Sequence, residues 1–266
     1  MSIFKIVVRS GLAICGIAAG NPVCASNKSP DTVTTVAQVQ DFNQGLGSLR
    51  TIEIQISHAQ GPNTFVLTPI IGERRIDAFH DSAIGASLEV YHDWSPNISS
   101  RSQVFVAENK VPFAHWTVSQ DLTVKVAGKT TVTVGGRFSR YFGDNDVVYL
   151  SGGVRQYFKL GSISYRLTWT KPAFSSGYLA HLGSITIKDN RGAGKTQLWV
   201  SYGSASLIDN QSQDSFRGKD YGFVVQRNQP LGGNLSAILR IGVSSYDRPG
   251  ARATAHTFGI GLSSPL

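Results

Sequence analysis

Apolar and polar residues alternate along most of the chain from about Ser48 onward, in segments that turn residues separate. Strict alternation predicts β-strands with one apolar face and one polar face. No long stretch shows the i, i+3, i+4 apolar spacing of an amphipathic helix. The predicted fold class is therefore all-β and antiparallel. The clearest alternating segments are 131–138, 148–158, 162–170 and 235–246.

The segments also have the length and the face chemistry of membrane-spanning strands. A soluble β-sandwich alternates too, but these segments run to about nine to twelve residues. That is close to the ~9–11 residues a tilted strand needs to cross a bilayer and longer than the ~5–6 of soluble strands. Their polar faces carry Ser, Thr, Gly and Arg, as expected of a barrel interior. The sequence therefore predicts a transmembrane antiparallel up-and-down β-barrel.

Aromatic residues near the strand ends support this prediction, because such residues form girdles at membrane interfaces. The candidates for these girdles are Trp94, Tyr141, Phe142, Tyr157, Phe158, Trp169 and Tyr246.

The predicted number of strands is about 12, with 10 or 14 as alternatives, since single-chain bacterial barrels have an even number. Pro69 interrupts one early candidate, and proline removes a donor from the ladder. One of the first two candidates is therefore predicted not to be a strand. Connections alternate between shorter and longer, which predicts short turns on the periplasmic side and longer loops outside. Thirteen candidates begin near residues 51, 64, 84, 102, 122, 131, 147, 162, 178, 196, 219, 235 and 252.

Composition excludes a helical membrane protein. Of the 266 residues, 41% are hydrophobic and 16% are charged, and mean hydropathy is −0.07. A soluble domain is usually about a quarter charged. After Ser26 no apolar run approaches the ~20 residues of a spanning helix. A mature chain in a membrane must then cross it with strands, and only a closed barrel satisfies all their backbone polar groups in lipid.

The N-terminus has the layout of a secretory signal peptide. Lys5 and Arg9 form a basic region, residues 11–20 an apolar core, and residues 23–25 a small-residue cleavage site. An export signal before barrel strands predicts the outer membrane of a Gram-negative cell envelope. The predicted organisation is a signal peptide at 1–25, a polar periplasmic tail at 26–47 and an outer-membrane barrel at 48–266.

Cysteine usage and charge narrow the chemistry further. Both cysteines, Cys15 and Cys24, fall inside the predicted signal, so the mature chain would have no thiol for a disulfide, a metal or catalysis. Removing Lys5 and Arg9 leaves 25 − 2 = 23 basic against 17 acidic residues, a net charge of +6. This modest excess suits anionic lipid headgroups or polysaccharide and predicts no binding to nucleic acid.

Five strand-like runs lie between residues 121 and 203, and glycine, arginine and aromatic residues stand at fixed positions in most of them. They are Asp-Leu-Thr-Val-Lys-Val from 121, Thr-Val-Thr-Val-Gly-Gly-Arg-Phe-Ser-Arg-Tyr-Phe from 131, Asp-Val-Val-Tyr-Leu-Ser-Gly-Gly-Val-Arg-Gln-Tyr-Phe from 146, Gly-Ser-Ile-Ser-Tyr-Arg-Leu-Thr-Trp-Thr from 161 and Leu-Trp-Val-Ser-Tyr-Gly from 198. These runs resemble the YaiO family of outer-membrane β-barrel proteins. The resemblance implies an exported barrel of about this length. It implies no established reaction and therefore no catalytic residues.

No catalytic, metal or cofactor site is predicted, and the chain is expected not to be an enzyme. The six histidines lack zinc-site spacing, and residues 192–196 imitate a P-loop but lack its first glycine. One rival hypothesis is an outer-membrane enzyme acting on lipid or glycan, for which His181 and Ser184 are the only, weak candidate residues.

Basic residues at interior positions form the candidate functional site. One interpretation is that they brace the interior by pairing with Glu89, Asp93, Tyr149 and Tyr157, since buried guanidiniums generally need partners. The other is an electropositive channel or cleft that attracts anions. Bracing is favoured. The set is Lys125, Arg137, Arg155, Arg166 and Arg240.

The hypothesis to test first is passage or docking of anionic solutes or polysaccharide through this interior. A third hypothesis is a purely structural or assembly partner that acts through the loop 209–220. The expected partners are outer-membrane lipid, the barrel-assembly machinery and envelope polysaccharide. The barrel is expected to be a monomer.

Overall fold

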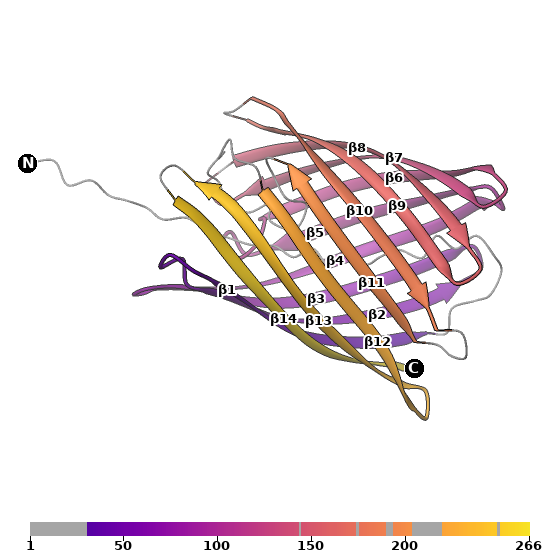
Figure 1. Ribbon diagram of the computed structural model, residues 1–266, viewed down its shortest axis with the longest axis horizontal. Coiled ribbons are helices and arrows are strands. Elements are labelled where there is room, and N and C mark those ends of the chain that lie inside the picture. The colour runs from indigo at the N-terminus through magenta and orange to yellow at the C-terminus, as the bar shows by residue number, and fades with distance from the viewer. Residues whose placement is uncertain (1–30, 144, 174–175, 190–193, 204–219, 249–250) are drawn as a thin grey trace, which may run out of the picture.

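Fourteen antiparallel strands form one closed barrel in a computed structural model, which describes residues 31–143, 145–173, 176–189, 194–203, 220–248 and 251–266. Each strand pairs with its neighbours in sequence, and the last pairs with the first (Figure 1). In these ranges no helix is long and apolar enough to cross a membrane. The strands are β1 (Thr32–Phe42), β2 (Ser48–Gln60), β3 (Asn63–Ile76), β4 (Phe79–Ser95), β5 (Ile98–Ala107), β6 (Trp116–Ala127), β7 (Thr130–Tyr141), β8 (Asn145–Phe158), β9 (Gly161–Pro172), β10 (Tyr178–Lys188), β11 (Lys195–Gly203), β12 (Asp220–Gly232), β13 (Leu235–Arg248) and β14 (Ala251–Pro265).

The all-β antiparallel closed barrel predicted from the sequence is confirmed. The structure pairs fourteen strands, the alternative to the favoured count of about 12. The thirteen candidates correspond to β2 through β14, and the missing strand is β1. Pro69 ends neither β2 nor β3. It lies inside β3 on the exposed face, and the pairing of β2 with β3 is interrupted only between Glu53–Ile70 and Ile56–Leu67.

The predicted periplasmic tail is wrong from residue 32 onward, because residues 32–42 are a strand of the barrel wall. β1 pairs with β2 on one side and with β14 on the other. Its alternation is hard to see in the sequence because the two faces contrast weakly. Thr35 and Ala37 stand on the exposed face, whereas Val36 is buried on the opposite one. The predicted signal peptide lies outside the described residues.

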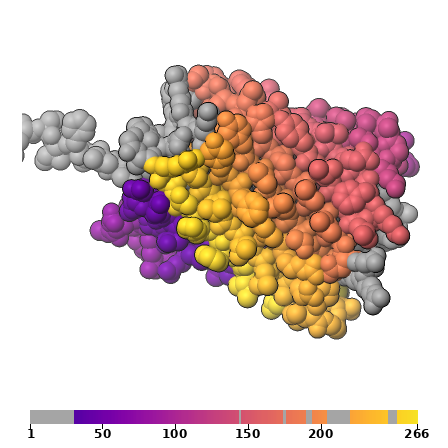
Figure 2. Space-filling view, viewed as in Figure 1, coloured from indigo at the N-terminus to yellow at the C-terminus, as the bar shows by residue number. Residues whose placement is uncertain are grey.

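The two faces of the wall differ as the alternation predicts. Large apolar side chains cover the outside, where Ile71, Ile84 and Ile260 are all more than half exposed. Polar side chains such as Gln40, Thr168 and Ser201 are buried on the inside. Figure 2 shows the outer surface of the later strands as oblique bands. In a membrane, this apolar surface is stabilised by contact with lipid, while the polar side chains remain inside.

The connections at the two barrel ends differ in length. At the turn end, where the Leu266 N–H donates to the Asp31 carbonyl (2.8 Å), the strands are joined at 61–62, 96–97, 128–129, 159–160, 189–194 and 233–234. At the opposite end, the loop end, the strands are joined at 43–47, 77–78, 108–115, 142–144, 173–177, 204–219 and 249–250. The loop 209–220 lies almost entirely outside the described residues.

Two of the predicted girdle residues face the interior. Tyr141 is buried, and its hydroxyl lies 3.0 Å from that of Tyr149. Tyr157 shares the inward face of β8 with Tyr149. By contrast, Trp94, Phe158 and Trp169 are exposed on the outer wall. The side chain of Tyr246 is not described.

The loop 108–115 folds into the barrel mouth and forms a core there. Pro112, Phe113 and Ala114 are buried, and Phe113 packs edge-on against Phe105 with ring centroids 6.0 Å apart. A Cβ at Gly72 would overlap the Phe113 ring, so glycine on β3 makes room for the loop.

Hydrogen bonds fix the loop 108–115 to β4. The Asp81 carboxylate accepts from the Val111 N–H at 3.1 Å, and Glu108 Oε2 accepts from the Ile84 N–H at 3.2 Å. Hydrogen bonds from Lys110 and Ile84 hold the pKa of Glu108 below its ordinary value. Glu108 is therefore ionised at neutral pH, and this contact weakens only as the pH falls through that lowered pKa.

Gly161→Ala should destabilise the barrel. A Cβ at this position would overlap the Thr186 carbonyl oxygen on the neighbouring strand, and overpacking of this kind costs about 1–3 kcal/mol. Gly152→Ala is the matched control, because nothing lies near its Cβ position. Urea unfolding followed by heat-modifiable gel mobility measures both. Equal stability of the two variants would contradict the described packing of β9 against β10.

Candidate functional site in the barrel interior

Four of the five predicted basic residues lie on inward strand positions well inside the barrel. Arg137, Arg155, Arg166 and Arg240 are all half-buried and share the inward face of their strands with buried residues such as Ser139, Tyr149, Thr168 and Ser244. Lys125 also stands at an inward position in the alternating pattern of β6, but its side chain is exposed, beside the register shift at the turn end. The set therefore separates into four interior arginines and one lysine at the rim.

Arg166 belongs to a chain of ion pairs that crosses several strands. Arg101 on β5 pairs with Glu89 on β4, with Nη2 3.0 Å from Oε1. Asp121 on β6 then lies between two arginines, its Oδ2 3.9 Å from Arg101 Nη1 and 3.5 Å from Arg166 Nη2. We call these four residues the ion-pair chain. It links β4, β5, β6 and β9 across the interior.

Glu89 is the most buried member of the ion-pair chain and is fully engaged. Its side chain is 6% exposed. Besides Arg101, it accepts hydrogen bonds from the Tyr91 hydroxyl (2.7 Å) and from Gln103 Nε2 (3.1 Å). A buried carboxylate requires such partners because isolated burial of a charge is very costly. The Glu89 end of the ion-pair chain therefore has a structural role.

Two glycines on the intervening strands clear the path between Asp121 and Arg166. A Cβ at Gly135 on β7 would overlap the Asp121 carboxylate, and a Cβ at Gly153 on β8 would meet the Tyr165 carbonyl oxygen and lie 3.4 Å from the Arg166 Cβ. Because both glycines face inward, the two charged side chains can reach each other over β7 and β8. The Gly-Gly pairs of the sequence therefore have a steric function at this site.

Arg240 is held by neutral amides at the seam of the barrel. Its Nε and Nη2 donate to Gln226 Oε1 at 3.0 and 2.8 Å, and its Nη1 donates to Gln38 Oε1 at 2.9 Å. Gln38 is on β1, so these bonds span the junction between the two ends of the chain. Glu53 on β2 is near enough to interact with Arg240 electrostatically.

Arg137 lies beneath the core of the barrel mouth. Its guanidinium carbon is 3.7 Å from the centre of the Tyr149 ring, a cation–π contact. Tyr149 belongs to the same buried cluster as Phe113 and Tyr141. The inward-folded loop and the arginine layer are thus in direct contact through one aromatic ring.

The predicted bracing partners are correct in part. Tyr149 braces Arg137, and Glu89 braces an arginine, although that arginine is Arg101 and not one of the predicted set. Asp93 lies at the turn end of β4, beside a register shift. Sequence reasoning missed Arg101 and Asp121. Both residues stand at inward-facing positions in the alternating pattern of β5 and β6, which was the available signal. The sequence does not give the register between the two strands that places these side chains next to each other.

His181 and Ser184 lie on opposite faces of β10. The His181 ring is on the outer wall, with Nδ1 2.7 Å from the Tyr165 hydroxyl. Ser184 faces inward, with its hydroxyl 2.7 Å from that of Ser164. A spacing of three residues in a strand produces this separation, so the two side chains form no catalytic pair. Within the described ranges, no group of three or more His, Asp or Glu residues could hold a metal ion.

The YaiO membrane beta barrel domain matches residues 30–208 of the chain. The chain belongs to this family. The match includes β1, in agreement with its place in the wall, and the remaining strands β12, β13 and β14 complete the YaiO barrel. As a membrane barrel of this family, the protein lies in the outer membrane.

Solved outer-membrane structures have the same fold at very low sequence identity. The CymD monoaromatic hydrocarbon channel has a TM-score of 0.64 at 5% identity, over 90% of this chain and 89% of that one. A Pseudomonas aeruginosa FadL homologue has 0.57 at 9%, over 89% and 90%. A bacterial polysaccharide outer membrane secretin has 0.55 at 9%, over 88% and 98%. At these identities the similarity shows the fold of the YaiO barrel alone.

A double-mutant cycle should show coupling between Asp121 and Arg166. The pair is partly exposed, with side chains 18% and 34% accessible, so we expect a coupling energy of about 1 kcal/mol. The measurement is urea unfolding of Asp121→Asn, Arg166→Gln and the double variant in detergent micelles. Additive effects would show that the YaiO barrel does not depend on this contact.

Proposed function

We propose that the barrel passes or docks anionic solutes or anionic polysaccharide through its interior, and that the inward arginines select for negative charge. The observation that carries the proposal is the excess of inward cations over carboxylates at mid-barrel. Among the residues that the structure describes, the inward carboxylates away from the strand ends are Glu53, Glu89 and Asp121. The inward arginines are Arg101, Arg137, Arg155, Arg166 and Arg240, and Arg74 is buried on the inward face of β3 nearer the loop end.

The arginines differ in how their charge is compensated. Arg101 and Arg166 belong to the ion-pair chain, where carboxylates offset them directly. Arg240 is oriented by the amide oxygens of Gln226 and Gln38, which accept its hydrogen bonds without neutralising its charge. Glu53 offsets part of this charge electrostatically. The remaining charge, held by neutral hydrogen-bond acceptors, contributes positive potential to the interior, as charged rings do in selective pores.

The inward-folded loop 108–115 narrows the entrance of the barrel, which supports passage of selected solutes and not a wide, unselective pore. Phe113 and its neighbours reduce the barrel mouth beside Tyr149, which contacts Arg137. A solute that enters from the loop end would meet this aromatic constriction and an arginine together. The proposal applies to the barrel with fourteen strands paired in the register described above.

Two further expectations stay predictions: the protein is a monomer, and it catalyses no reaction. Its assembly partners also stay a prediction.

The test is ion selectivity of the full-length barrel in planar lipid bilayers. The wild type should conduct with anion preference, measured as the reversal potential in a KCl gradient. Arg240→Gln removes one interior charge. At a distance of about 8 Å in water, a unit charge changes the energies of an anion and a cation by ~0.5 kcal/mol in opposite directions, so the anion preference should fall roughly fivefold, and by less where salt screens the charge.

Arg227→Gln is the charge-matched control. Arg227 is on the outward face of β12 and pairs with Asp189 at the turn end, so its loss should leave selectivity unchanged. An equal effect of the two substitutions would mean that interior charge does not select the ion. If the wild type neither conducts nor retains polygalacturonate, an acidic polysaccharide, the proposed function is wrong.

A further inference from the structure

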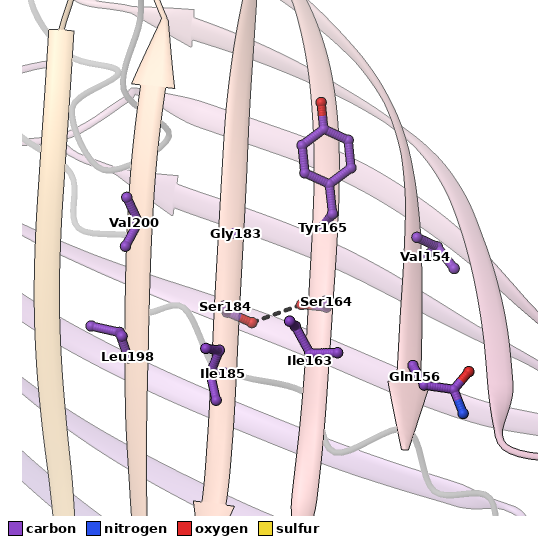
Figure 3. Close-up of a pocket in the computed structure, with 10 residues that line it drawn as sticks. All are labelled: Val154, Gln156, Ile163, Ser164, Tyr165, Gly183, Ser184, Ile185, Leu198 and Val200. Carbon is purple, nitrogen blue, oxygen red and sulfur yellow. Dashed lines mark hydrogen bonds between the residues drawn. The ribbon is translucent and has the colours of Figure 1, made fainter. Parts of the chain in front are cut away.

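A groove of about 440 Å³ lies on the outer wall over β8 to β11. Figure 3 shows apolar side chains around it, with Val154 and Ile163 on one side and Leu198 and Val200 on the other. Gly183 forms its floor, and the hydrogen-bonded pair Ser164–Ser184 lies on the inward side of the same strands. The groove is therefore a hollow in the membrane-facing surface and does not belong to the interior site.

The hollow exists because β10 has glycine in the middle of its outward row. Gly183 pairs directly with Tyr165 on β9 and with Val200 on β11. A Cβ at Gly183 would meet one atom within 4 Å, the Val200 carbonyl oxygen at 3.9 Å. Its φ is not in the left-handed region, so the backbone does not require glycine. Glycine inside a strand costs about 0.5–1 kcal/mol, and it often marks close approach of a ligand.

A row of polar aromatic rings leads from the groove toward the loop end. The Tyr165 hydroxyl lies 2.7 Å from His181 Nδ1, and in Figure 3 the Tyr165 ring points along the strand away from Ile163. Tyr202 stands opposite His181 with ring centroids 6.0 Å apart, and Tyr221 stands opposite Tyr202 at 5.3 Å. Arg252 completes the row, its guanidinium carbon 5.3 Å from the centre of the Tyr221 ring.

We infer that the groove and this row form a binding site for a phosphate-bearing, acylated lipid of the leaflet at the loop end. An acyl chain would fill the hollow over Gly183, because the surface is apolar and faces the bilayer core. The phosphate group would lie along the row, where tyrosine hydroxyls and Arg252 offer hydrogen-bond donors and a cation. The longer loops place this end outside the cell, where lipid A is the lipid with this chemistry.

Native mass spectrometry of the full-length barrel, released from detergent micelles with added lipid A, tests the inference. Gly183→Leu places a side chain in the groove from a Cβ position that has only an ordinary contact, and it should lower the retained lipid A at least fivefold. Arg252→Gln should also lower it. Gly136→Leu is the control, since Gly136 is also an outward strand glycine whose Cβ position has only ordinary contacts, and it should retain lipid A like the wild type.

Phosphatidylglycerol is the second arm, because it carries one phosphate and two chains. Equal retention of both lipids, with equal loss in Gly183→Leu, would show a general acyl groove and overturn the selection of lipid A. Undiminished lipid A on Gly183→Leu, or no retention by the wild type, would overturn the site itself. Ion selectivity in bilayers is a separate readout, so this failure would leave the proposed function untouched.

Discussion

Backbone hydrogen bonding in lipid is the constraint on which the rest of this structure depends. An unpaired N–H or C=O in the hydrocarbon core costs several kcal/mol, so an open sheet cannot remain there. The pairing of β1 with β14 along Thr32–Pro265 to Phe42–Ala255 removes the last two edges. Gln38 on β1 is also bonded to Arg240 on β13. Closure therefore fixes the wall and orients an interior cation at the same junction.

Closure leaves a polar interior whose charges must be compensated, and the barrel does this in two ways. The ion-pair chain alternates two carboxylates with two arginines, and glycines at 135 and 153 leave room for the side chains that meet over two strands. Elsewhere neutral groups hold the cations, with amide oxygens at Arg240 and an aromatic face at Arg137. The first arrangement stabilises the wall. The second leaves positive charge inside, which is the basis of the proposed selectivity.

Alternation predicts most of this architecture because each strand has a lipid face and an interior face. It fails at β1, where Thr35 and Ala37 replace large apolar residues on the lipid face, so the two faces look alike. Parity placed Arg137, Arg155, Arg166 and Arg240 inside correctly. Alternation within a strand could not predict the contact of Asp121 with Arg166. That contact depends on the register between strands and on the tilt of the strands, which are set by tertiary pairing. Nor could alternation find the loop 108–115 in the mouth, because Phe113 is buried by a turn and not by a strand.

The outer wall and the interior are thus two surfaces of one sheet, and both depend on the fourteen-strand closure. Disulfide cross-linking in the outer membrane tests that closure most directly, with cysteines in place of Ala37 and Ile260, which stand opposite each other on β1 and β14. Directly opposed strand residues have Cβ atoms ~4.5–5.5 Å apart, so oxidation should cross-link this pair efficiently. The contradicting result is no cross-link at this pair, with an efficient one between cysteines at Ile54 and Ile260, which would show β2 closing the barrel without β1.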